Sequence, residues 1–257
     1  MITACKISYN VQQTALLQDI DLELPYGGLV VIAGPDGAGK STLLSLLSNE
    51  LEAPEQPIFF KDRGYDAWDR RLLPLHKAKF SQHPQTDIPL TVEEVVLMGR
   101  YPYFEAAPQD TDLKAVQEAM ALTEVKALAK RDYNTLSGGE KQRVHLARVL
   151  TQLDNAIDHK LLFLDEPLNN LDVLHQHTVL HTLKNFSERG HTVVVVLHDL
   201  NLAARFASHI ILMKRGKIYQ QGNPDEVFTS ECISRVYDFP CTICRHPVNQ
   251  ERLILFG

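Results

Sequence analysis

Eight consecutive residues have the types and spacing that suit phosphate binding: Gly34-Pro35-Asp36-Gly37-Ala38-Gly39-Lys40-Ser41. They fit the pattern G-x-x-x-x-G-K-[ST] between the apolar run Leu29–Ala33 and an apolar helical pattern. Glycines let backbone N–H groups converge on phosphate oxygens, and a helix N-terminus adds its positive dipole end. Lys40 supplies charge for the β- and γ-phosphates, and Ser41 offers a hydroxyl to Mg²⁺. Together with Thr42, this segment predicts a loop that binds a nucleotide.

A second chemical element is the apolar run Leu161–Leu164, which ends in the carboxylates Asp165 and Glu166. A strand this apolar is typical of the centre of a parallel sheet, and ligands bind at the carboxyl ends of such strands. Asp165 is then placed to hold Mg²⁺, and Glu166 to polarise an attacking water. The alternative is a strand that simply ends at solvent, but the phosphate loop makes this reading unfavourable.

A third element is Leu136-Ser137-Gly138-Gly139-Glu140. Ser137 is a good N-cap residue, and two glycines at a helix start leave bare N–H groups for an anion. An ordinary capped helix is the alternative.

These residues together resemble the ATP-binding cassette (ABC) ATPases. Leu136–Glu140 is similar to the signature motif of that family, and Leu168–Asp172 resembles its D-loop, which places Asp172 at the nucleotide. His198 follows the apolar run Val193–Leu197 like the family's switch histidine. Two further correspondences are Gln82 with the Q-loop glutamine and Tyr9 with the aromatic residue that stacks on adenine.

The resemblance implies a homodimer that closes head to tail over two ATP molecules with Mg²⁺. Ser137, Gly138 and Gly139 of one copy would then meet the γ-phosphate held by the other. It implies that Glu166 is the general base, that His198 stabilises the transferred phosphoryl group, and that Gln82 joins Ser41 and Asp165 at the metal.

Two positions depart from the usual family pattern. Asp36 stands where the family commonly has Asn, and its charge is expected to weaken phosphate binding unless it points away. Glu140 replaces the commoner Gln of the signature motif.

The branch of the family is suggested by Val92–Pro102, by Leu197–Arg205 and by the tail around Arg235–Tyr237 and Arg245–Pro247. The first two segments resemble importers for haem, ferric siderophores and vitamin B12. The tail, together with extra residues at Leu153–His159, looks most like the hemin import ATPases. The partners implied are integral membrane permease subunits and, indirectly, a periplasmic substrate-binding protein. Aromatic residues Tyr101, Tyr103 and Phe104 are expected to offer a docking surface for a permease helix. A nucleotide-gated clamp without hydrolysis is the rival from another class.

Composition agrees with this reading. The 257 residues include 26 Lys+Arg and 32 Asp+Glu, for a net charge of −6, with 44% hydrophobic residues. No apolar run reaches the roughly 20 residues of a membrane-spanning helix. An acidic chain with scattered basic residues predicts no nucleic-acid partner. The expected location is peripheral, on the cytoplasmic face of the bacterial inner membrane.

The elements that must position these residues alternate between strands and helices. The expected fold class is α/β, a P-loop NTPase of the ABC type. We predict one domain over 1–257, in which 1–82 and 155–257 form a RecA-like core with an N-terminal antiparallel β subdomain. Residues 83–154 are predicted as an inserted helical signature subdomain. Helix Thr42–Leu51 is expected after the loop, with its apolar stripe inward.

Three other groups of residues are interpreted as structural or surface residues without a chemical role. Cys241 and Cys244 lie on a predicted strand, where a spacing of three puts them on opposite faces, so a metal pair is disfavoured. The cluster His175, His177 and His181 is expected on a solvated helix face. Trp68 is expected to be a half-buried residue of a surface turn.

Overall fold

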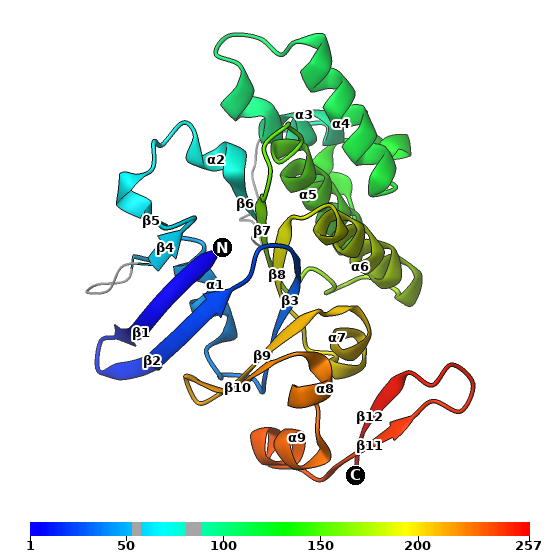
Figure 1. Cartoon of the computed structure of the whole chain (residues 1–257). Coiled ribbons are helices and arrows are strands. Elements are labelled where there is room, and N and C mark those ends of the chain that lie inside the picture. Colours follow the sequence, from blue (N-terminus) through cyan, green and yellow to red (C-terminus); the bar gives the residue numbers. More distant parts are fainter. Residues whose placement is uncertain (53–57, 81–88) are drawn as a thin grey trace.

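The computed structural model describes residues 1–52, 58–80 and 89–257 (Figure 1). Gln82 lies outside the described residues. At the centre is a six-stranded sheet in the order β10-β9-β3-β8-β7-β6. All neighbouring strands in it are parallel except the β9–β10 pair. In sheet order the strands are β10 (Lys217–Gly222), β9 (His209–Lys214), β3 (Gly28–Ala33), β8 (Thr192–Val196), β7 (Leu161–Asp165) and β6 (Lys77–Phe80).

A second, antiparallel sheet has the order β2-β1-β4-β5 and is built largely from the N-terminal strands. Its strands are β1 (Ile2–Val11), β2 (Thr14–Leu24), β4 (Ile58–Phe60) and β5 (Arg63–Gly64). Ile2 and Ala4 are buried, and so are Ile7 and, in part, Tyr9, as the two-residue period of a strand covered on one face requires. Between the two pairs the register shifts at Lys6, which has a left-handed φ of 51°. The predicted antiparallel β start is therefore confirmed.

The central sheet is buried on both faces, as its nearly continuous apolar strands predict. Val30 and Ile32 of β3 point into a core shared with α1 (Lys40–Leu47) and the N-terminal sheet. Leu29 and Val31 point into the opposite core. Helices α6 (Val173–Glu188) and α7 (Leu200–Phe206) cover that second side. The predicted α/β class is confirmed.

Helix α1 differs from the prediction at both ends. It starts at Lys40 and ends at Leu47, four residues before Leu51. Asn49 adopts a left-handed φ of 55°, a backbone conformation that commonly ends helices. The apolar stripe of α1 is buried as expected.

A helical region lies between β6 and β7, at the top of Figure 1. Its elements are α3 (Val92–Leu97), η2 (Met98–Tyr103), α4 (Asp110–Leu122), η3 (Lys126–Leu128), η4 (Tyr133–Thr135) and α5 (Gly138–Gln152). A buried Arg100 holds it together, since Nε donates to Asp112 at 2.9 Å and Nη1 donates to the carbonyl of Thr151 at 3.0 Å. The region between β5 and β6 contains η1 (Tyr65–Ala67) and α2 (Leu73–His76).

The aromatic residues expected to dock a permease helix differ in exposure, and Tyr103 is partly engaged within the chain. Its ring lies against the Arg100 guanidinium, 3.5 Å from the ring centroid, and its hydroxyl donates to the Gln152 carbonyl at 2.5 Å. Tyr103 is therefore half-buried and structural. Tyr101 is the exposed aromatic residue of the group, with 59% of its surface accessible.

The chain ends in α8 (Pro224–Val227), α9 (Ser230–Tyr237) and a hairpin of β11 (Cys241–Arg245) and β12 (Arg252–Phe256). Cys241 is buried and Cys244 is exposed, so the predicted strand and opposite faces are confirmed. Among the described residues, no group of three or more His, Cys, Asp or Glu side chains could hold a metal ion. Across the same ranges, no helix combines the length and apolar character needed to span a bilayer.

Candidate functional site

The loop after β3 requires its glycines. Gly34 has φ of +147°, and a Cβ there would lie 2.3 Å from the Met213 carbonyl oxygen. Gly39 has φ of +96°, and a Cβ there would lie 2.8 Å from the Leu17 side chain. The loop is therefore held tightly between β9 and the N-terminal sheet, because a larger residue at either position would force the backbone to move.

The turn after β9 also supports this loop. The amide of Gly216 donates to the Ala38 carbonyl at 3.0 Å, and the amide of Gln18 donates to the Gly216 carbonyl at 2.9 Å. Within the loop, the Ala38 amide donates to the Pro35 carbonyl at 3.2 Å. Gly216 was not among the residues predicted for the site, because the sequence marks it only as part of an Arg-Gly turn between two strands.

Lys40 begins α1 and is buried, with 5% of its surface accessible. Its ammonium donates to the carbonyls of Gly34 at 2.9 Å and Pro35 at 3.0 Å. Asp36 lies 3.7 Å from the same ammonium, while its own side chain is 94% exposed. The charge of Asp36 thus stands at the solvent rim of the loop and not inside it.

Ser41 and Asp165 come from distant segments and meet at the carboxyl edge of the sheet. The Ser41 hydroxyl donates to Asp165 Oδ1 at 3.0 Å. Burial is the main cause that raises the pKa of Asp165, the neighbouring Glu166 adds to it, and the hydrogen bond from Ser41 opposes it. A hydroxyl and a carboxylate are oxygen ligands of the kind that suit Mg²⁺, so this pair could hold that ion beside bound phosphates.

Glu166 is held by two donors. Its carboxylate accepts hydrogen bonds from His198 Nε2 at 2.6 Å and from Asn169 Nδ2 at 2.7 Å. Burial tends to raise the pKa of Glu166, but these hydrogen bonds from His198 and Asn169 outweigh it and leave the pKa below its ordinary value. The carboxylate is therefore ionised and oriented at neutral pH. Sequence analysis assigned no role to Asn169, whose only signal was its position three residues after Glu166.

His198 lies between Glu166 and Asp36 of the phosphate loop. While Nε2 contacts Glu166, Nδ1 lies 3.6 Å from Asp36 Oδ1. The next residue, Asp199, caps α7 by accepting from the amides of Asn201 and Leu202. A small cavity of about 130 Å³ borders Glu166, Asn169 and His198.

Ser137 lies at the start of α5, in a reciprocal cap. Its Oγ accepts from the Glu140 amide at 3.3 Å, and the Glu140 carboxylate accepts from the Ser137 amide at 2.7 Å. Glu140 thus serves the capping box as well as Gln would. Ser137 and Gly138 are exposed and Gly139 is half-buried.

The remaining predicted residues lie as follows. Tyr9 is half-buried on β1 and pairs across the sheet with Leu17, whose side chain lies against Gly39. Thr42 lies in the first turn of α1, and Asp172 is the N-cap of α6. The structure thus brings together the loop at 34–42, Asp165, Glu166 and His198, whereas the polar contacts of Ser137 run within its own helix.

The fold and this site define an ATP-binding cassette. A model of the ABC transporter family matches residues 17–169. A dimeric cassette described in a post-hydrolysis state with ADP and Pi is 28% identical, with a TM-score of 0.75 over 87% of this chain and 99% of that one. A cassette in its ADP conformation gives a TM-score of 0.78 at 20% identity, over 93% of this chain and 98% of that one.

Curated relatives extend the similarity over nearly the whole chain. Hemin import ATP-binding protein HmuV of Pseudomonas aeruginosa is 41% identical over 240 residues, covering 93% of each chain. Its namesake from Vibrio vulnificus is 42% identical over 243 residues, covering 94% of this chain and 92% of that one. The chain belongs to the ABC transporter family and is an ATP-hydrolysing subunit of it.

Proposed function

We propose that this chain hydrolyses ATP to power the import of hemin through an ABC transporter of the bacterial inner membrane, on whose cytoplasmic face it acts. Hydrolysis is supported above all by the ionised Glu166, which Asn169 and His198 hold in place beside the hydrogen-bonded pair Ser41 and Asp165. The hemin cargo is supported by the relatives named as hemin import ATP-binding proteins, which match over most of the chain.

In this proposal Glu166 accepts the proton of the attacking water. Hydrogen bonds from Asn169 and His198 fix the direction of its carboxylate, and the adjacent cavity of about 130 Å³ leaves room for a water molecule. His198 would also donate to the transferred phosphoryl group. Ser41 and Asp165, together with Gln82, would hold Mg²⁺, which neutralises the charge on the phosphates.

The active unit we propose is a homodimer. The exposed Ser137 and Gly138, with the half-buried Gly139, would complete the site of the second copy, while Tyr9 would stack on adenine and Asp172 would lie at the shared edge. Exposed Val173 and Leu174, at 71% and 70% accessible surface, directly follow Asp172 and supply apolar area for this contact.

Permease subunits are the proposed further partners, with a periplasmic substrate-binding protein acting indirectly. Residues 83–154 would move as a helical subdomain against the core at 1–82 and 155–257. Tyr101 gives this region an exposed aromatic side chain that suits permease docking.

The test is transport by the whole complex. The chain, reconstituted in vesicles with the permease encoded beside it and the matching binding protein, should import hemin only with ATP and Mg²⁺. A ferric siderophore and cobalamin serve as competing cargoes in parallel assays. Uptake of either one without uptake of hemin would contradict the cargo, and uptake without ATP turnover would contradict the function.

A further inference from the structure

The Asp172 loop, residues 168–172, packs directly on the signature helix of the same chain. A Cβ at Gly139 would lie 2.7 Å from the Asn170 carbonyl oxygen and 3.2 Å from Leu171 Cδ2. The start of α5 and this loop therefore share one packed junction. Because the Asp172 loop leads directly into α6, contacts that hold this loop also fix the position of α6 relative to the signature helix α5.

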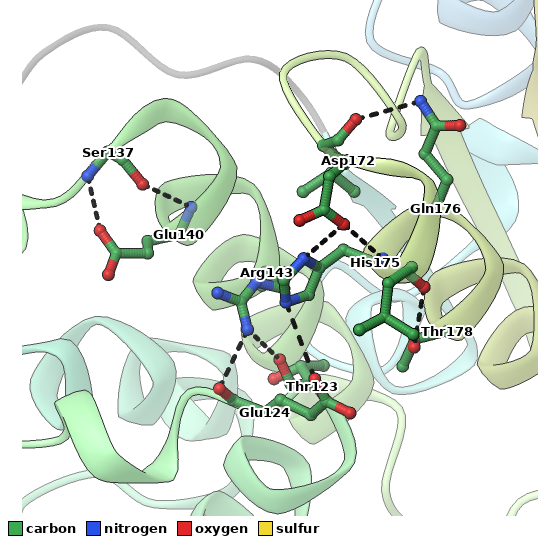
Figure 2. A network of polar contacts seen from close by, with 11 residues as sticks. Thr123, Glu124, Ser137, Glu140, Arg143, Asp172, His175, Gln176 and Thr178 are labelled. Carbon is green, nitrogen blue, oxygen red and sulfur yellow. Dashed lines mark hydrogen bonds and ion pairs between the residues drawn. The ribbon is translucent and has the colours of Figure 1, made fainter.

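His175 bonds the loop from the first turn of α6, as Figure 2 shows. Its backbone amide donates to Asp172 Oδ1 at 2.9 Å, and its ring Nδ1 lies 2.8 Å from the same oxygen. Because a carboxylate only accepts, Nδ1 carries the proton in this bond. The two bonds fix the Asp172 carboxylate, and they lower its pKa below the ordinary value.

The other ring nitrogen of His175 faces the helical region. Nε2 lies 3.8 Å from the carboxylate of Glu124, which follows α4 and has a left-handed φ of 57°. That turn is fixed from α5, since Arg143 Nη1 donates to the carbonyls of Glu124 at 3.0 Å and Thr123 at 3.4 Å (Figure 2). His175 thus stands between the Asp172 loop and a rigid point of the helical region.

We propose that His175 is a positioning residue, a latch that holds the Asp172 loop in register with the helical region. In the latch both ring nitrogens carry a proton, so that Nδ1 donates to Asp172 on one side and Nε2 faces the Glu124 carboxylate on the other. The role extends the proposed ATPase function and rests on it. Asp172 and Ser137 both lie at the edge that the second copy would meet, so their relative position decides whether both contacts form together. Loss of the latch would slow the assembly of the composite site by the two copies, while the phosphate loop of each copy would stay unchanged.

The structural half of the test needs no nucleotide. Hydrogen exchange of peptides covering 168–176 is compared in wild type and His175→Ala, with His181→Ala as the matched control. His181 is exposed on the same helix, and its ring packs against the Phe206 ring, away from the Asp172 loop. We expect exchange to accelerate about fivefold in His175→Ala, the order that one or two such contacts supply, and to stay unchanged in His181→Ala.

The kinetic half separates kcat from KM. His175→Ala should lower kcat about fivefold and leave the KM for ATP unchanged, and Glu124→Gln combined with it should add no further loss. His175→Asn, whose amide replaces Nδ1 alone, should restore slow exchange but not kcat.

Equal exchange and turnover in wild type and His175→Ala, or full rescue of turnover by His175→Asn, would overturn the latch. Wild-type protein that lacks ATPase activity but shows the exchange difference would instead contradict the proposed function and leave the latch standing.

Discussion

Alanine substitutions at the two signature glycines, Gly138 and Gly139, should change the stability of the protein by different amounts, because the two positions are packed differently. Gly138 and Gly139 are neighbours in the first turn of α5, and neither has a positive φ, so alanine suits the backbone at both. Their surroundings differ. A Cβ on Gly138 meets Asn170 Cβ at 3.4 Å, whereas one on Gly139 meets the Asn170 carbonyl oxygen at 2.7 Å.

The expected energies follow from these distances. Overpacking against a backbone atom that cannot rotate away costs roughly 1–3 kcal/mol, and Gly→Ala in a helix returns up to about 1 kcal/mol. Gly139→Ala should therefore lower the free energy of unfolding by about 1 kcal/mol, which is roughly 2–4 °C in Tm for a chain of this size. Gly138→Ala should be neutral or raise Tm by about 2 °C.

Differential scanning calorimetry of the nucleotide-free protein measures this difference before any dimer contact intervenes. The Gly139→Ala variant should also change hydrogen exchange at 168–172, since the displaced atom belongs to Asn170. A Tm for Gly139→Ala at or above that of Gly138→Ala would refute the packing argument.

Three further outcomes are expected. Glu166→Gln should retain ATP binding but lower hydrolysis by at least about 10²-fold, because the general base is lost, and near-normal turnover would contradict that role. In the Glu166→Gln background with ATP and Mg²⁺, sedimentation should show a dimer that Ser137→Arg abolishes by steric block and that Ser137→Ala retains; equal dimerisation of all three would contradict composite sites. Burial, with Lys160 and Arg189 nearby, lowers the pKa of His191 to about 4. Because the unfolded chain then binds a proton that the folded one does not, stability should fall as pH drops from about 6.5 to 4, and a Tm series in His191→Gln should be flatter than in wild type.

The central strands could be predicted from the local sequence. Leu161–Leu164, Val193–Leu197 and Leu29–Ala33 are apolar enough to predict buried central strands. The structure places them in the six-stranded sheet except for Leu197, which directly follows β8. The end of α1 was predicted less well, because the left-handed Asn49 stops the helix through a backbone conformation that the apolar pattern does not report.

The sequence by itself determined the phosphate loop, the carboxylates after β7 and the capped signature helix, since each is a contiguous pattern whose chemistry lies in local backbone geometry. Only the tertiary structure decided which side chains meet across it: Ser41 with Asp165, Asn169 with Glu166, and His175 between two carboxylates. Such contacts depend on the order of strands in the sheet and on loop packing, which join segments that are distant along the chain. The half-buried state of Tyr103 was hidden for the same reason, because Arg100 and the Gln152 carbonyl reach it only in the folded chain.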